Sequence, residues 1–147
     1  MYHRFNENKY PSTNIRVEDF TKHISLIKAE NLTFLKAEEF ENHINSKNTE
    51  RKILLTIDDG FESFYLNAWP ILKAEKIPFI LFVSTREVGA NNYMSWDQIR
   101  EIAKEDFVHI GNHSHTHEYL IDRTNKEIEE DIKKSIAIFK KELGFNS

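Results

Sequence analysis

The stretch KILLTIDDGF, residues 52–61, joins an apolar run to two adjacent carboxylates. Its first part, Lys52–Ile57, is β-rich and shows no polar alternation, which is typical of a strand buried on both faces of a parallel sheet. The Asp-Gly pair that follows indicates a tight turn. A turn requires only one Asp and adjacent carboxylates repel each other, so turn formation alone does not explain the doubled Asp.

Further strands and helices are predicted on both sides of this stretch. Strands are expected at residues 1–5, 32–35, 78–85 and 107–112. Apolar spacing and two capping boxes, Ser95 with Gln98 and Thr124 with Glu127, predict helices at residues 17–30, 37–45, 64–76 (interrupted near Pro70), 96–105 and 125–143. This alternation indicates βαβ units and a parallel sheet, either doubly wound or part of an α/β barrel. In both folds the chemistry lies at the C-terminal ends of the strands.

The strand predicted at residues 107–112 runs into a histidine-rich stretch, HSHTH, so that residues 109–117 hold four of the seven histidines. His113 and His117 share a face if the chain makes a helical turn there, whereas His113 and His115 share a face of a strand. Either pair could bind a metal ion, because imidazole is the commonest metal ligand. The alternatives are a solvated cluster, or one buried His with a backbone partner.

The Asp-Asp-Gly stretch and the histidine-rich stretch are more informative together than apart. Each directly follows a predicted buried strand, so both are expected at the same rim of the sheet. One carboxylate and two imidazoles form a set that holds a divalent ion and leaves other positions open to water and substrate. A second carboxylate beside the first supplies a base, and the ion relieves the cost of keeping both ionised. This arrangement would explain the doubled Asp.

Composition narrows the classes of function. The chain of 147 residues has the size of one domain, which we expect to span residues 1–147. Its net charge of −4 and the lack of a Lys/Arg run argue against a nucleic-acid partner. No apolar stretch has the roughly 18 residues of a transmembrane segment. Because the sequence has no Cys, any metal must be held by His and carboxylate groups.

These motifs resemble those of a known family. TIDDGF is similar to the first motif of the polysaccharide deacetylases (carbohydrate esterase family four, the NodB homology domain), HSHTH to their second motif, and YHRF…YPST to the start of many members. The resemblance implies that Asp58 is the catalytic base and that Asp59, His113 and His117 are metal ligands. His115 occupies a variable position of the second motif and receives no role.

The resemblance also implies a fold and an activity. The fold would be a partial, distorted (β/α) barrel with parallel strands, incomplete at its C-terminus. The activity would be a metal-dependent hydrolysis, with zinc as the preferred divalent ion. The reaction would remove acetyl groups, N-acetyl before O-acetyl, from a carbohydrate polymer or oligosaccharide. Members act mostly on envelope polymers, which favours the cell envelope or a secreted form.

The chain departs from the family pattern after the second motif. We expect an Arg-containing loop and a Leu-x-His motif that supplies the general acid to lie beyond it, but only one helix follows. Residues 1–147 are therefore predicted to be the N-terminal part of a deacetylase catalytic domain, with an exposed sheet edge that favours self-association. Two alternatives stay open: a catalytically incomplete metal- or glycan-binding module, and a small-amide deacylase. His3 is expected to have a structural role, and Phe61, Phe64 and Trp69 to pack in the core.

Overall fold

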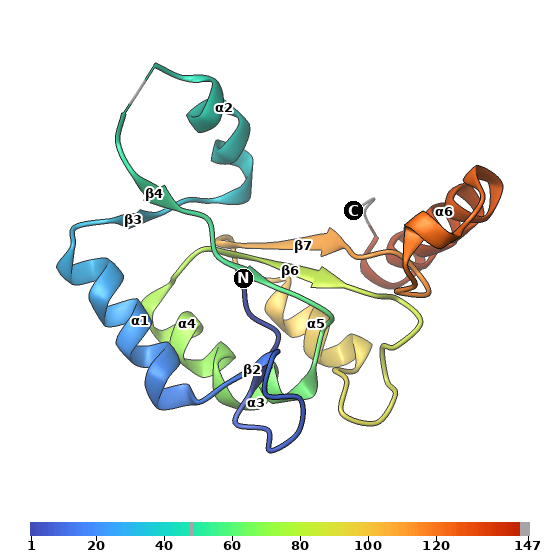
Figure 1. Cartoon of the computed structure of the whole chain (residues 1–147), viewed down its shortest axis with the longest axis horizontal. Coiled ribbons are helices and arrows are strands. Elements are labelled where there is room, and N and C mark those ends of the chain that lie inside the picture. Colours follow the sequence, from blue (N-terminus) through green and yellow to red (C-terminus); the bar gives the residue numbers. More distant parts are fainter. Residues whose placement is uncertain (48, 145–147) are drawn as a thin grey trace.

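The computed structural model describes residues 1–47 and 49–144. In this part of the chain, the largest sheet has three parallel strands in the order β5-β6-β7 (Figure 1). These strands are β5 (Thr56–Ile57), β6 (Phe79–Val83) and β7 (Val108–Asn112). Two parallel pairs accompany them: β1 (Arg4–Phe5) with β2 (Asn14–Ile15), and β3 (Thr33–Phe34) with β4 (Lys52–Ile53).

Helices connect the strands, as the alternating pattern predicts. The α-helices are α1 (Val17–Ala29), α2 (Phe40–Asn45), α3 (Glu62–Asn67), α4 (Trp69–Glu75), α5 (Trp96–Ile102) and α6 (Asn125–Leu143). The described residues also form two 3-10 helices, η1 (Ala37–Glu39) and η2 (Leu120–Asp122). Both predicted capping boxes are present, at the starts of α5 and α6. None of the described helices is long and apolar enough to cross a membrane.

Two predicted elements differ in detail. The helix expected at residues 64–76 begins at Glu62 and breaks at Ala68, just before Pro70, which cannot donate a backbone hydrogen bond. The strand expected from Lys52 to Ile57 is divided in two. Its first part pairs with β3 and its second part with β6, so the tertiary partner changes within one apolar run.

The core lies between the sheet and its helices. Figure 1 shows α1, α3, α4 and α5 on one side of the strands, and their buried side chains pack together with Leu81 and Val83 of β6. Phe61, Phe64 and Trp69 are at most 3% exposed, which confirms their predicted place in the core. Burying such a side chain contributes about 1.5–3 kcal/mol of stability.

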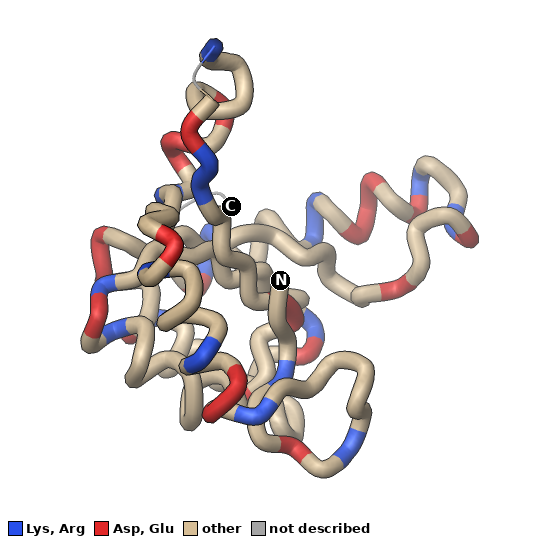
Figure 2. The backbone as a smooth tube through the Cα atoms, turned by 60° about the vertical axis from the view of Figure 1, so that its left-hand side comes forward, with Lys and Arg blue, Asp and Glu red and all other residues tan. Residues whose placement is uncertain are grey.

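The opposite face of the sheet is less completely covered. On β7, His109 is exposed, and on β6 the Phe82 ring is half-buried, so this face of the two strands is only partly buried. Gly111 lies on this face, because a Cβ there would come within 2.5 Å of the Phe82 ring. Figure 2 shows most Lys, Arg, Asp and Glu residues on helices and loops, and β5, β6 and β7 contain none of them.

Candidate metal centre

The first part of the site is the turn after β5, residues 58–61. Asp58 is 8% exposed, and its backbone N–H donates to the Tyr2 carbonyl at 2.9 Å. Asp59 and Gly60 both adopt the left-handed conformation, with φ of 73° and 78°. Positive φ angles are unfavourable for most residues, but Gly adopts them freely and Asp more readily than most. The Asp-Gly sequence therefore suits this turn. The turn directs the Asp59 carboxylate towards the end of β7.

The second part is the histidine loop, residues 113–117, which directly follows β7. Its first residue remains in register with the sheet, since the His113 N–H donates to the Val83 carbonyl at 3.0 Å. Ser114 and His117 have positive φ angles of 67° and 56°. The loop thereby turns back on itself and brings His117 beside His113, with ring centroids 4.9 Å apart.

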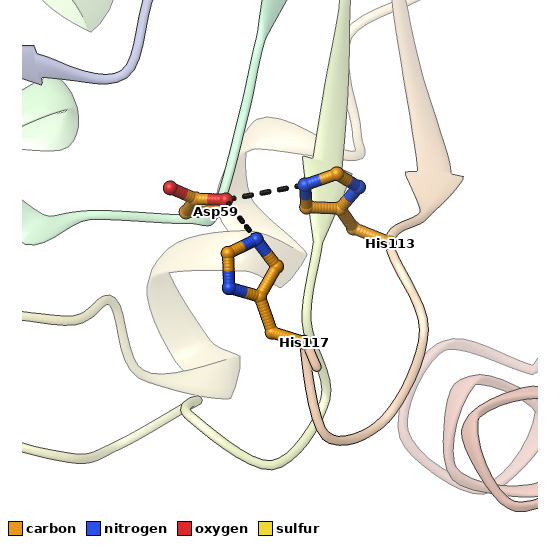
Figure 3. A group of neighbouring side chains, drawn as sticks. All are labelled: Asp59, His113 and His117. Atoms are coloured by element: carbon orange, nitrogen blue, oxygen red, sulfur yellow. Dashed lines mark ion pairs between the residues drawn. The ribbon is translucent and has the colours of Figure 1, made fainter. Parts of the chain in front are cut away.

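Asp59, His113 and His117 converge on one point (Figure 3). Asp59 Oδ1 lies 3.2 Å from His113 Nε2 and 3.0 Å from His117 Nε2. One ligand atom from each residue lies within 4.8 Å of the others. The structure thus brings together the three residues that the sequence predicts as metal ligands.

A buried carboxylate oxygen that accepts no hydrogen bond indicates that these residues fit a metal ion. Asp59 Oδ1 is inaccessible to solvent and accepts no hydrogen bond within the described residues, although two imidazole nitrogens face it. Burying a charged oxygen without a hydrogen bond is costly, and a bound cation removes that cost. One carboxylate oxygen and two imidazole nitrogens also match the donors that Zn²⁺ and similar divalent ions prefer.

The surroundings of Asp58 and Asp59 shift the pKa values of their carboxyl groups in opposite directions. Burial raises the pKa of Asp58 above its ordinary value, although the charges of His113 and His3 oppose this. Burial acts in the same direction on Asp59, but the neighbouring His113 ring and the charges of His117 and His3 outweigh it and lower the pKa of Asp59. The His113 pKa is raised in turn, chiefly by Asp59. Asp59 is therefore the better anion for a metal, and Asp58 the better proton acceptor.

His3, for which the sequence favours a structural role over one facing the site, is a neighbour of the two carboxylates. Tyr2 pairs with Ile57 in parallel, so His3 follows this bridge beside Asp58. The positive charge of His3 acts on both Asp58 and Asp59. The short strand pattern at residues 1–5 was visible in the sequence, but its pairing with β5 was not.

His115, by contrast, lies away from the three candidate ligands. Its side chain is buried, and its Nδ1 lies 2.9 Å from the Thr85 hydroxyl. Burial lowers the pKa of His115, with a further contribution from the charge of Lys134. This ring therefore packs against the segment that follows β6.

Comparisons with known proteins identify the family of the chain. A family model described as polysaccharide deacetylase matches residues 45–146. The poly-beta-1,6-N-acetyl-D-glucosamine N-deacetylase of Staphylococcus aureus (strain MSSA476) is 30% identical over 118 residues, covering 77% of this chain and 41% of that protein. The enzyme of the same name from Staphylococcus epidermidis is 27% identical over 125 residues, covering 82% and 43%. The chain thus spans about two-fifths of the length of these curated relatives.

Solved structures extend the likeness to nearly the whole chain. IcaB from Ammonifex degensii superposes with a TM-score of 0.88 at 25% identity, covering 99% of this chain and 69% of that one. The Streptococcus pyogenes deacetylase PplD, solved in complex with acetate, gives a TM-score of 0.85 at 24% identity, covering 100% and 69%. The expected partial (β/α) barrel is confirmed, which settles the choice against a doubly wound sheet. The chain belongs to the polysaccharide deacetylase family.

Proposed function

We propose that this chain carries the metal-binding and base-bearing part of a carbohydrate deacetylase catalytic domain, and that its substrate is an N-acetylated glucosamine polymer. One observation carries the proposal: Asp59 Oδ1, buried and without a hydrogen bond, faces two imidazole nitrogens at 3.0 and 3.2 Å, with Asp58 next to it in the chain. The names of the staphylococcal relatives supply the choice of polymer.

The proposed roles follow from the position and charge of each residue. Asp59, His113 and His117 hold a divalent ion, with zinc as the first choice. When bound, such an ion polarises a carbonyl and lowers the pKa of water. Asp58 accepts the proton of the attacking water, a role suited to a buried carboxylate with a raised pKa.

A metal titration tests the ligand set. Zn²⁺ titrated into the metal-stripped protein should bind at one site by calorimetry, and Asp59→Ala should abolish this binding. The matched control is His109→Ala, because His109 is an exposed histidine on β7 that is absent from the candidate centre. Equal binding by the protein and by Asp59→Ala would rule out the proposed ligand set.

Substrate assays separate the proposal from its two alternatives. Acetate release from N-acetylglucosamine oligomers, above that from acetylated xylan and small amides, would support the proposal. Release from small amides alone would indicate a small-amide deacylase, and glycan binding without turnover would indicate a binding module.

A further inference from the structure

The histidine loop is held along one side by the segment that follows β6. Three consecutive carbonyls of the loop, those of His113, Ser114 and His115, accept hydrogen bonds from this segment. The donors are, in order, Ser84 Oγ at 2.8 Å, Thr85 N at 3.2 Å and Arg86 N at 3.0 Å. These bonds fix the carbonyl side of the loop but leave its N–H groups to find other partners.

On the N–H side of the loop, a single carboxylate from α6 accepts the hydrogen bonds of the two middle N–H groups. Asp131 Oδ2 accepts the His115 N–H at 2.7 Å, and Asp131 Oδ1 accepts the Thr116 N–H at 2.9 Å and the Thr116 hydroxyl at 2.7 Å. Hydrogen bonds to an ionised carboxylate are among the stronger ones in proteins. The bound amides lie between the two candidate ligands, His113 and His117.

Two short side chains complete the support at either end of the loop. The side-chain Oδ1 of Asn112 accepts a hydrogen bond from the Ser114 N–H at 2.9 Å. The Ser114 hydroxyl accepts one from the His117 N–H at 3.0 Å. The amide of Asn112 in turn donates to the hydroxyl of Ser135, a buried residue one turn beyond Asp131 on α6, at 2.8 Å. Every backbone N–H from residue 113 to residue 117 therefore has a partner.

Such support matters because the loop conformation is unfavourable by itself. Ser114 and His117 both have positive φ, a region that non-glycine residues occupy at an energetic cost. If the Asp131 contacts were lost, the backbone between the two histidines could relax. The two imidazoles would then no longer be held against Asp59.

We propose that Asp131 is a positioning residue of the metal centre: its carboxylate holds the backbone between His113 and His117 so that both imidazoles face Asp59 before an ion binds. This inference rests on the proposed function. Asp131 itself is absent from the ligand group and acts through the loop. Groups that orient metal ligands without touching the ion typically contribute about 10–100-fold to metal affinity.

The test compares Zn²⁺ affinity, by calorimetry of the metal-stripped protein, between Asp131→Ala, Asp131→Asn and the control Glu130→Ala. Glu130 is the exposed neighbour of Asp131 on α6, and its ion pair among the described residues is a 3.8 Å surface contact with Lys126. We expect a loss of about 10–100-fold for Asp131→Ala. Asp131→Asn should lose less, because its amide keeps one acceptor oxygen, and Glu130→Ala should not differ from the parent protein.

Two further readouts separate positioning from general stability. Amide hydrogen exchange of the metal-free protein should accelerate at His115 and Thr116 in Asp131→Ala, and the visible spectrum of bound Co²⁺ should change at saturation. If Asp131→Ala does not fold, Asp131→Asn decides the question by the same three measurements. A folded variant with unchanged affinity, exchange and Co²⁺ spectrum would overturn the positioning role. No metal binding by the parent protein would instead refute the proposed function, while the exchange measurement would still report on the loop.

Discussion

The turn at residues 58–61 and the histidine loop at residues 113–117 supply ligands to the same centre but are held in different ways. The turn takes its shape mainly from its own backbone, through the positive φ angles of Asp59 and Gly60. Two backbone bonds anchor it, from Asp58 N to the Tyr2 carbonyl and from Met94 N to the Gly60 carbonyl, both at 2.9 Å. The loop also has backbone bonds along its carbonyl side, but its N–H groups from residue 114 to residue 117 all depend on side chains, above all on Asp131 of α6.

This difference determines where each region is vulnerable. A turn defined by its own dihedral angles fails when one of its residues is changed. A loop held by a distant carboxylate also fails when that distant residue is changed, although all its own residues are intact. Substitutions in the two regions should therefore affect binding, turnover and folding in different proportions.

The largest effects are expected within the turn, where two adjacent carboxylates should give different results. Asp58→Asn should lower acetate release by about 10²–10⁴-fold, because it removes the base but leaves the ligand set intact. Asp59→Ala should abolish both metal binding and turnover, because it removes the carboxylate that faces both imidazoles. Calorimetry with Zn²⁺ and an acetate-release assay on the same samples measure both quantities.

The converse result would reverse the assignment of roles. If Asp58→Asn lost the metal and Asp59→Ala retained it, Asp58 would be the ligand. The contrast between neighbouring residues is itself the control, since both side chains are substituted at the same turn and both are largely buried.

A smaller effect is expected from Gly60→Ala, which tests whether the backbone shapes the turn. Gly60 has a φ of 78°, where an L-residue costs roughly 1–2 kcal/mol. There is room for the added methyl group, because its closest contact would be Val83 at 3.7 Å. The free energy of unfolding, from urea denaturation, should fall by this amount, and metal affinity should fall with it because Asp59 precedes Gly60.

Gly89→Ala is the matched control for this substitution. Gly89 has a similar φ of 82° and open space around it, and it lies outside the candidate centre. It should lose a similar free energy of unfolding but keep the metal affinity of the parent protein. An equal loss of metal affinity in both variants would mean that general destabilisation, rather than the turn geometry, controls the site.

The same contrast explains how much of the site the sequence could predict. That the two Asp residues and the histidine stretch share one rim was predictable from local signals, because each directly follows a strand and parallel strands end on one rim. The choice of His117 over His115, and the roles of Asp58 and Asp59, came from the resemblance to the family. Asp131 was not predictable, because it is one of several acidic residues on α6 and only the folded chain shows which of them faces the loop.

The fold follows the same rule. The parallel α/β architecture and the capped starts of α5 and α6 depend on periodicity and on contacts three residues apart, so the sequence predicts them. The division of the run Lys52–Ile57 between two partners depends on where β3 and β6 lie, which periodicity does not encode. The place of His3 beside Asp58 likewise depends on a long-range pairing, that of Tyr2 with Ile57.

The smallest expected effect is the contribution of Asp131 to the dependence of stability on pH. Burial acts to raise the pKa of Asp131, but the hydrogen bonds from Thr116 and His115 outweigh it and lower this pKa. A carboxyl with a lower pKa in the folded state stabilises that state fully above its unfolded pKa of about 3.9. This stabilisation is lost as the pH falls through the folded pKa.

The stability difference between the parent protein and Asp131→Asn should therefore stay nearly constant from about pH 7 to pH 5 and shrink below about pH 4. Because Asp131 is only half-buried, we expect the change to be smaller than that for Gly60→Ala. Urea denaturation across this range measures it, and a His115→Gln background removes the neighbouring imidazole that also titrates. A difference that stayed constant down to pH 3 would show that the hydrogen bonds to residue 131 stabilise the loop without its negative charge.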